Sequence, residues 1–536
     1  MTAKSNLRGS IMGLHGRVPV PVTLPGRLRG DASWTAWLAV GCVCVCVLVL
    51  AWCVATTPAA VPFGDVAVIE MTTRAALRRA VLVGPYSQYG WHHPGPLQYY
   101  LHAPVYFVAG STTFSLTLAA LWVNGLALAA LWRGLAAVPR LSALAIAAAV
   151  SAYVWRAGDL AGSAWNAHVI VIPLMTAVVL CASGSLGRPL ALAGGVVAAS
   201  LAMQSSVSVG ITAVVVVALT GGLALRTLAP NPAALRATLM ATGVGVLLWL
   251  PPVFEQLTGQ PGNVTRIWSF FATAARPTHS LFESLLIWSD ALTSAWRPGF
   301  TLAWGGAYTP RGTWTLAAVA VLLVSATAFL AVRRKCDPGL SRVSAVAALG
   351  ALVAMWSVTR IVGRVGSYQV FWMSGIGALL AGCLAAHVLS AVARGPAIVR
   401  FTTTALRAVI VVALAAASAG VVWRAREYAL NQVAQRATRY VVAIETTRHL
   451  ATIGAKRPRF HFSPLIWTHG AGIALHAYRE GFEVTVDDPW IPVFGSYFAP
   501  RGREDVVLEV ATRCGASGRV AARGDGLCVY EVGKPR

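Results

Sequence analysis

Two carboxylates, Asp65 and Glu70, stand close together just after the first long apolar run of the chain. A positioned carboxylate can take a proton from a hydroxyl as a general base, and charge close to a membrane is unfavourable unless it has a role. The residues that follow, 71–79, have helical periodicity and predict an amphipathic helix on the membrane surface. A structural interpretation stays open, in which Asp65 caps this helix and Glu70 pairs with Arg74 four residues later.

A second candidate segment runs from Gly84 to Pro96 and holds three glycines, three prolines, three aromatic residues and two histidines. Proline and glycine fix an irregular backbone, which at membrane depth is tolerated only inside protein or against a cavity. Aromatic ring faces contact the C–H groups of sugars, and histidine can donate a hydrogen bond to a phosphate. The alternative is an aromatic belt with turns. We interpret four residues of the segment as substrate-binding: Tyr86, Trp91, His92 and His93.

Two arginines, Arg360 and Arg364, are predicted to share one helical face at the outer end of a membrane span. The planar guanidinium group matches the oxygens of a phosphate, so we assign both residues to substrate binding. The alternative is that their side chains only reach toward the membrane surface from the span.

The composition indicates a membrane protein. Hydrophobic residues make up 57% of the chain and charged residues only 12%, against about 25% in soluble proteins. The net charge of +24 comes from bases that separate apolar runs, so it does not predict nucleic-acid binding. The chain has no phosphate-binding glycine loop followed by Lys-Ser or Lys-Thr, which argues against an ATP-driven transporter. The histidines of the tail have no metal-ligand spacing, and no metal site is predicted.

The apolar runs predict an all-α polytopic membrane protein with about eleven transmembrane helices. Residues 1–33 form a basic segment, and the run 34–57 is too long for a signal-peptide core, so we expect an uncleaved first span. The membrane module covers residues 34–424 and includes two long outer loops, 58–109 and 256–312. The ten further spans are expected at 110–132, 141–156, 165–183, 190–205, 206–225, 238–255, 313–332, 342–360, 368–391 and 405–423.

The charge distribution predicts the orientation in the plasma membrane. With residue 1 in the cytoplasm, the inner segments carry 17 bases and two acids, as the positive-inside rule requires. Eleven spans then place the C-terminus outside, and the count depends most on residues 190–225. The tail, 425–536, holds 11 of the 19 acids and predicts a small extracytoplasmic α/β domain. Cys514 and Cys528 are the only cysteines of this tail, and an oxidising compartment would join them in a disulfide.

The chain resembles the GT-C superfamily of membrane glycosyltransferases. The resemblance lies in the basic N-terminus, the single span and an acidic residue in a long first outer loop. It covers residues 30–425 in architecture and 63–96 in motif, and the Trp91–Pro96 block is similar to actinobacterial members. It implies a polyprenyl-phosphate sugar donor, with Asp65 as the general base and Glu70 as its partner. The family often has its two acids adjacent or separated by one residue, so the spacing of Asp65 and Glu70 departs from its pattern.

The function expected from this resemblance is transfer of a sugar to an acceptor hydroxyl outside the membrane, on a cell-envelope glycan, lipid or protein. Membrane lipid is expected to surround the protein, and no nucleic-acid partner is expected. No cofactor is expected either, with a role for a divalent cation left open. Two other classes stay open from the residues alone. One is a secondary transporter of a lipid or polar solute, and the other is a non-catalytic membrane scaffold for cell-envelope assembly.

Overall fold

The computed structural model describes most of the chain after residue 60. The described residues are 61–228, 232–273, 278–298, 300, 302, 308, 313–333, 336–392, 419–420, 423, 426–427, 437–514, 518–524 and 526–532. The predicted basic segment 1–33 and the first span, 34–57, lie outside them, and so does almost all of the span predicted at 405–423.

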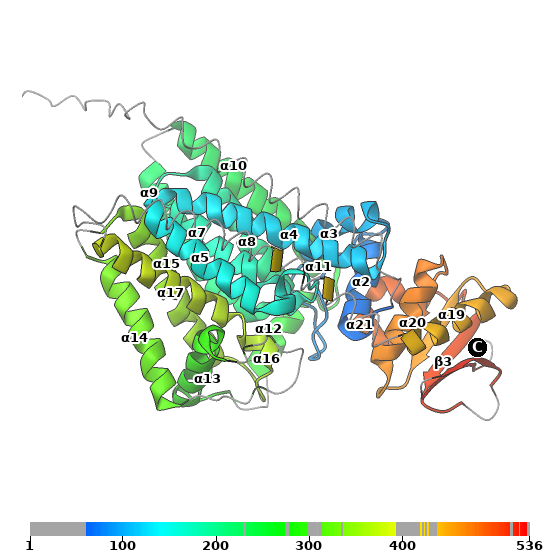
Figure 1. Cartoon of the computed structure of the whole chain (residues 1–536). Coiled ribbons are helices and arrows are strands. Elements are labelled where there is room, and N and C mark those ends of the chain that lie inside the picture. Colours follow the sequence, from blue (N-terminus) through cyan, green and yellow to red (C-terminus); the bar gives the residue numbers. More distant parts are fainter. Residues whose placement is uncertain are drawn as a thin grey trace, which may run out of the picture. The chain divides into compact units, whose positions relative to one another are not determined.

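The described part of the membrane module is helical (Figure 1). Six of its helical segments are long and apolar enough to cross a membrane: Thr113–Ala137, Asn166–Gly184, Val207–Thr227, Trp314–Ala331, Pro338–Val358 and Ser367–Val392. Each lies where the sequence predicts a span. The shorter helices α5 (Arg140–Arg156) and α8 (Pro189–Ser205) occupy two more predicted spans. The prediction of a polytopic helical membrane protein is therefore confirmed.

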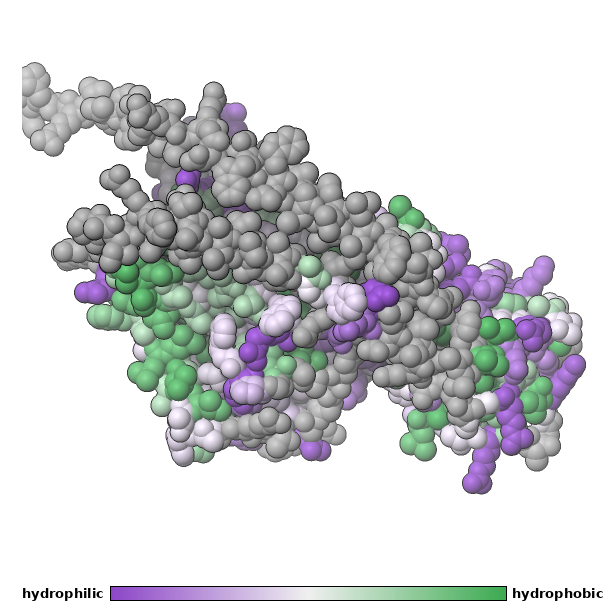
Figure 2. Space-filling model, viewed as in Figure 1, coloured by the Kyte–Doolittle hydropathy of each residue, from purple (hydrophilic) through white to green (hydrophobic). Residues whose placement is uncertain are grey.

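Large apolar side chains lie on the outside of this module, where a soluble protein would carry polar ones. On α14 (Trp314–Ala331), Trp314, Leu322 and Phe329 are exposed. Figure 2 shows a continuous hydrophobic surface over this helix, whereas hydrophilic residues are scattered over the C-terminal domain. Contiguous apolar surface of this kind suits contact with lipid.

One predicted span is interrupted, whereas residues 190–225 form two separate helices, as the sequence predicts. The span expected at 238–255 is divided into α10 (Pro232–Leu248) and α11 (Leu250–Thr258), because the prolines at the start of α11 have no N–H groups to continue the helix. The two helices of residues 190–225 are separate, since Ser206 has extended backbone angles between α8 and α9 (Gly210–Leu228).

The two long outer segments contain helices of their own. The first holds α2 (Gly64–Ala76) and α3 (Leu97–Val108), joined by the irregular Gly84–Pro96 segment. The second holds α12 (Asn263–Thr273) and α13 (Leu281–Thr293). The sequence predicts a surface helix at residues 71–79, whereas the helix observed here, α2, begins at Gly64 and ends at Ala76. Most of its side chains are buried because α3 and α20 (Trp467–Arg479) pack against it.

The C-terminal domain is the predicted α/β unit. Its sheet has the strand order β2-β1-β3-β5-β4. Strands β1 (Pro458–Phe462), β2 (Thr485–Val486) and β3 (Val506–Ala511) pair in parallel, with Phe460 opposite Val486 and Leu508. Strands β4 (Val520–Gly524) and β5 (Leu527–Glu531) complete the sheet in antiparallel pairing. Helices α20 and α19 (Ala437–Thr452) pack together beside the sheet and bury its apolar residues, among them Phe460, Leu508 and Val529.

Cys514, which follows β3, and Cys528 of β5 are joined by a disulfide. Mass mapping of protein purified from membranes without reductant is expected to recover the two cysteines as one linked peptide. The bond closes a loop of 14 residues, so replacing both cysteines by serine is expected to lower the free energy of unfolding of the domain by about 3 kcal/mol. Two free thiols would contradict both the pairing and the expected placement of the tail in an oxidising compartment.

Candidate active site around Asp65

Asp65 lies in the first turn of α2, which begins directly after a tight turn. Gly64 provides this turn with a φ of +57°, and Thr468 of α20 lies 3.4 Å from where a β-carbon would stand. Both oxygens of the partly exposed Asp65 carboxylate accept hydrogen bonds. Tyr86 Oη donates to Oδ1 at 2.5 Å, and Trp165 Nε1 donates to Oδ2 at 2.9 Å. These two bonds fix the plane of the carboxylate and leave lone pairs on both oxygens.

The surroundings of Asp65 make it a stronger base than an ordinary aspartate. Burial raises the pKa of the Asp65 carboxyl, and the hydrogen bonds from Tyr86 and Trp165 oppose this rise without cancelling it. Burial and the adjacent carboxylate also raise the pKa of the Tyr86 hydroxyl, which therefore stays protonated as a donor. Because a general base works best when its pKa approaches the working pH, the shift at Asp65 favours proton abstraction.

Trp165 and Tyr368 complete the surroundings of Asp65, and the sequence did not indicate either of them. Their ring centroids lie 6.1 Å apart, and Gln88 Nε2 donates a hydrogen bond to Tyr368 Oη at 2.9 Å. Trp165 precedes α6 (Asn166–Val169), and Tyr368 lies in α16 (Ser367–Val370). Aromatic residues at the ends of spans are usual at a membrane surface, so only the fold distinguishes these two.

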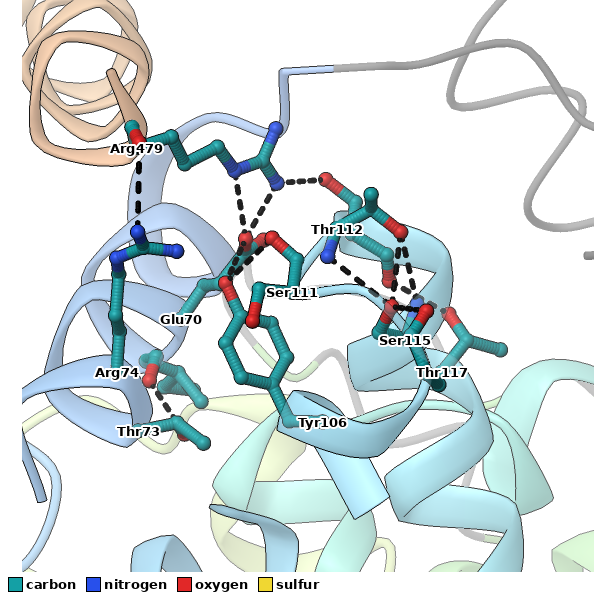
Figure 3. Close-up of polar contacts among 12 residues, drawn as sticks. Glu70, Thr73, Arg74, Tyr106, Ser111, Thr112, Ser115, Thr117 and Arg479 are labelled. Carbon is teal, nitrogen blue, oxygen red and sulfur yellow. Dashed lines mark hydrogen bonds and ion pairs between the residues drawn. The ribbon is translucent and has the colours of Figure 1, made fainter. Parts of the chain in front are cut away.

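The hydrogen-bond partners described for Glu70 differ from those of Asp65, and Glu70 belongs to a buried network of its own (Figure 3). Its Oε1 atom accepts hydrogen bonds from Tyr106 Oη at 2.8 Å and from Arg479 Nε at 2.8 Å, and it also contacts Arg479 Nη2. Arg479 Nη2 donates to Thr113 Oγ1 at 2.7 Å. Glu70 is fully buried, and its ion pair with Arg479 joins α2 to the last turn of α20.

This network differs from the local interpretation of Glu70, whereas its role as a supporting partner of Asp65 stays a prediction. Glu70 is ion-paired with Arg479, and Arg74 instead donates to the Arg479 backbone carbonyl at 3.3 Å. Asp65 is not a helix cap either, because the N-cap residue of α2 is Phe63 and makes no side-chain cap. Glu70 therefore stabilises the position of α2, the helix that carries Asp65.

The two histidines of the Gly84–Pro96 segment form hydrogen bonds that connect this segment to other parts of the chain. His93 Nδ1 accepts a hydrogen bond from the Val207 N–H at 3.2 Å, and His92 exchanges two hydrogen bonds of 2.8 Å between its backbone and the Asn263 side chain. Burial lowers the pKa of His92 to about 4 and that of His93 to about 3. Both rings are neutral near pH 7, so a contact of either with phosphate would be a hydrogen bond and not an ion pair.

Trp91 and Tyr86 have different surroundings. Trp91 is buried and packs against Tyr89, His93, Phe270 and Phe271, with ring centroids 5.4–6.4 Å away, which ties the segment to α12. Its Nε1 atom has no hydrogen-bond partner among the described residues. Tyr86 is partly exposed and directly contacts Asp65. Of the four residues predicted to bind substrate in this segment, Tyr86 is the one that the structure places at the carboxylate.

Arg360 and Arg364 are exposed, but they do not share a helical face. Helix α15 (Pro338–Val358) ends before Arg360, and Gly363, with a φ of +73°, turns the chain away from a helical path. Val362 forms an isolated antiparallel bridge with Thr278 and fixes the loop. The loop leads into α16, which carries Tyr368, a neighbour of Asp65.

A partly buried ion pair joins Asp290 and Arg297. The Asp290 carboxylate accepts hydrogen bonds from Arg297 and Tyr308, and Arg156 Nη2 donates to the Arg297 backbone carbonyl at 2.6 Å. Tyr308 in turn donates its backbone N–H to Val365 at 2.8 Å, which supports the loop of Arg360 and Arg364. Within the described ranges, no group of three or more His, Cys, Asp or Glu side chains is arranged to hold a metal ion.

The helical membrane module and the small α/β domain that packs against α2 have the overall fold of a known membrane protein. Two solved structures of ArnT from Cupriavidus metallidurans are similar to the chain, each at 13% sequence identity and over 93% of this chain and 98% of ArnT. The apo structure matches with a TM-score of 0.52, and the structure bound to undecaprenyl phosphate matches with 0.54. No protein-family model and no curated protein sequence matches the chain.

Proposed function

We propose that the protein is an integral membrane glycosyltransferase that moves a sugar from a polyprenyl-phosphate donor to an acceptor hydroxyl. The observation that carries this proposal is the Asp65 carboxylate, which is oriented by Tyr86 and Trp165 and has a raised pKa. The similarity to ArnT, solved with undecaprenyl phosphate, supports the donor class. We keep the extracytoplasmic face, a cytoplasmic N-terminus and an external tail as parts of the proposal, on the charge asymmetry alone. The actinobacterial type has no support beyond the Trp91–Pro96 block.

The proposed reaction needs one proton acceptor and one site for phosphate charge. The acceptor hydroxyl oxygen attacks the anomeric carbon of the donor sugar, its proton passes to Asp65, and the bond from the anomeric carbon to the phosphate oxygen breaks. The polyprenyl phosphate leaves with the electron pair of that bond. A phosphate is a ready leaving group, so charge stabilisation matters more than its protonation. We assign this stabilisation to Arg360 and Arg364, with hydrogen bonds from the Gly84–Pro96 segment.

Binding of undecaprenyl phosphate to protein in lipid nanodiscs tests the donor class. We expect the wild-type protein to bind this lipid and to co-purify with a polyprenyl phosphate that mass spectrometry identifies. The double variant Arg360→Ala/Arg364→Ala is expected to bind about 100-fold more weakly, since each charged hydrogen bond contributes about 1.5 kcal/mol or more.

A matched control separates this effect from a general loss of positive charge. Arg226 is exposed in the last turn of α9, an end of the module that the sequence places in the cytoplasm. Arg226→Ala is expected to bind the lipid as the wild type does. A wild-type protein that binds no polyprenyl phosphate would contradict the proposal, and it would favour the transporter or the scaffold.

A further inference from the structure

Three partly exposed aromatic residues contact one another in a row that runs from the candidate base, Asp65, into the C-terminal domain. Tyr86, which donates its hydroxyl to Asp65, contacts Trp467 edge-on with ring centroids 5.9 Å apart. Trp467 stacks on Trp490 at 5.8 Å with an angle of 29° between the rings. We call Tyr86, Trp467 and Trp490 the aromatic row. It joins the membrane module to the soluble domain, and the proposed function does not use its two tryptophans.

The fold of the domain places this row at the edge of the sheet where α/β proteins bind ligands. Trp467 begins α20, which follows the carboxyl end of β1. Trp490 ends a short 3-10 turn, Asp488–Trp490, directly after the carboxyl end of β2, and its Nε1 donates to the Phe462 carbonyl at 3.1 Å. In open sheets, ligands bind outside the carboxyl ends of the parallel strands. Here that edge continues along the row to Asp65.

Polar groups accompany the rings at the same edge. His461 on β1 contacts the Asp487 carboxylate, and the side chain of His461 is 45% exposed. The neighbouring Asp488 is exposed. The polar groups beside the rings thus include an imidazole and two carboxylates, and Arg459 Nε lies 3.9 Å from the Asp487 carboxylate. Together these groups can donate and accept hydrogen bonds.

We propose that the aromatic row, with His461 and Asp487, binds the acceptor substrate and that this acceptor is a neutral saccharide. The inference rests on the proposed function. Ring faces carry negative potential and contact the C–H groups of a sugar, while adjacent carboxylates bind its hydroxyls. A lipid tail would leave these polar groups without partners. A saccharide held along the row presents a hydroxyl to Asp65, which takes its proton as the new glycosidic bond forms.

Saturation-transfer difference NMR on the full-length protein in nanodiscs tests this site without the donor. The probes are hexasaccharides of mannan, galactan and arabinan. We expect saturation of the ring C–H protons of at least one of them. Trp490→Ala is expected to weaken its binding by about tenfold, the effect of one aromatic contact, and Trp490→Phe to restore most of it. The phenylalanine variant keeps an aromatic ring but loses the hydrogen bond to Phe462. Its binding therefore shows whether the ring contact with the saccharide or this structural hydrogen bond causes the effect of Trp490→Ala.

Phe482 offers a matched control in the same domain. It is also partly buried and packs on the same core, but it precedes β2 at the opposite end of the strand. Phe482→Ala is expected to bind the saccharide as the wild type does. Equal binding by Trp490→Ala, or loss of binding in Phe482→Ala as well, would overturn the proposed site.

The same samples distinguish failure of this inference from failure of the proposed function. Undecaprenyl phosphate binding with no hexasaccharide binding would overturn the saccharide site and leave the donor class standing. Saccharide binding with no undecaprenyl phosphate binding would overturn the glycosyltransferase, and with it the role of the bound sugar as an acceptor.

Discussion

Replacing Asp65 by asparagine is expected to lower the rate of sugar transfer by about 10²–10⁴-fold while leaving binding of the lipid donor nearly unchanged. The carboxamide has almost the same shape as the carboxylate but cannot take the proton of the acceptor hydroxyl. It can still accept the hydrogen bond from Tyr86 through its oxygen, although its amide group would then face the Trp165 N–H, which also donates. Transfer is measured with purified protein in nanodiscs. A thermal unfolding transition like that of the wild type, recorded on a separate sample, first shows that the variant is folded.

The pH dependence of the wild-type rate gives a second test of Asp65. Only the deprotonated carboxylate accepts a proton, so the rate is expected to fall as the pH decreases through the pKa of Asp65. Since burial raises that pKa, the fall should occur at higher pH than for an ordinary aspartate.

Two outcomes would contradict a role for Asp65 as the base. One is transfer at the wild-type rate by folded Asp65→Asn protein. The other is an acid limb of the pH profile that persists unchanged in that variant. Tyr86→Phe is the graded control, because it removes one hydrogen bond from the carboxylate and keeps the base, so its effect on the rate should be much smaller.

Replacing Arg479 by methionine is expected to destabilise the contact of α20 with α2 by about 3–5 kcal/mol. The substitution leaves the fully buried Glu70 carboxylate without its cation, and one unpaired buried charge is far more unfavourable than a missing ion pair. Hydrogen exchange of the α2 and α20 amides measures this free energy as local opening. Because α2 carries Asp65, the rate of transfer should fall with the loss of protection.

Two further variants show whether the buried charge causes the effect. In the double variant Glu70→Gln/Arg479→Met no charge is left buried, so most of the stability should return. Arg457→Met removes an arginine from the exposed pair with Asp505 in the same domain, and its effect should be far smaller. A loss in the double variant as large as in Arg479→Met would mean that packing, and not the ion pair, holds the two helices together.

The sequence was sufficient for those parts of the fold that depend on local patterns. Apolar runs of about 20 residues located the helices of the module, and the change of composition after residue 424 located the α/β domain. The interruption of the predicted span 238–255 at Trp249 could have been predicted from Pro251 and Pro252, but a count of apolar residues does not take the effect of proline into account. The error at Arg360 and Arg364 has a similar origin, because Gly363 and the bridge of Val362 end the helical path between them.

The candidate site could be predicted only in part, because its residues meet through tertiary packing. Asp65 and Tyr86 lie in one loop, so their segment could be recognised. Trp165 is 100 residues away from Asp65, and nothing in its local sequence distinguishes it from an ordinary aromatic residue at a membrane surface. Glu70 had a plausible local partner in Arg74, whereas its actual partner, Arg479, lies on the soluble domain.

The distance in sequence between Glu70 and Arg479 has a consequence for how the protein is made. The two residues are 409 positions apart, and chains grow at about 5–20 residues per second, so Glu70 emerges about 20–80 s before its cation exists. Throughout this interval the helix that carries Asp65 lacks the α20 surface against which it is buried. The candidate base therefore reaches its final setting only after the last part of the chain has been synthesised and folded. Under the proposed function, a nascent or truncated chain inserted in the membrane would be unable to consume lipid-linked sugar before its biogenesis is complete.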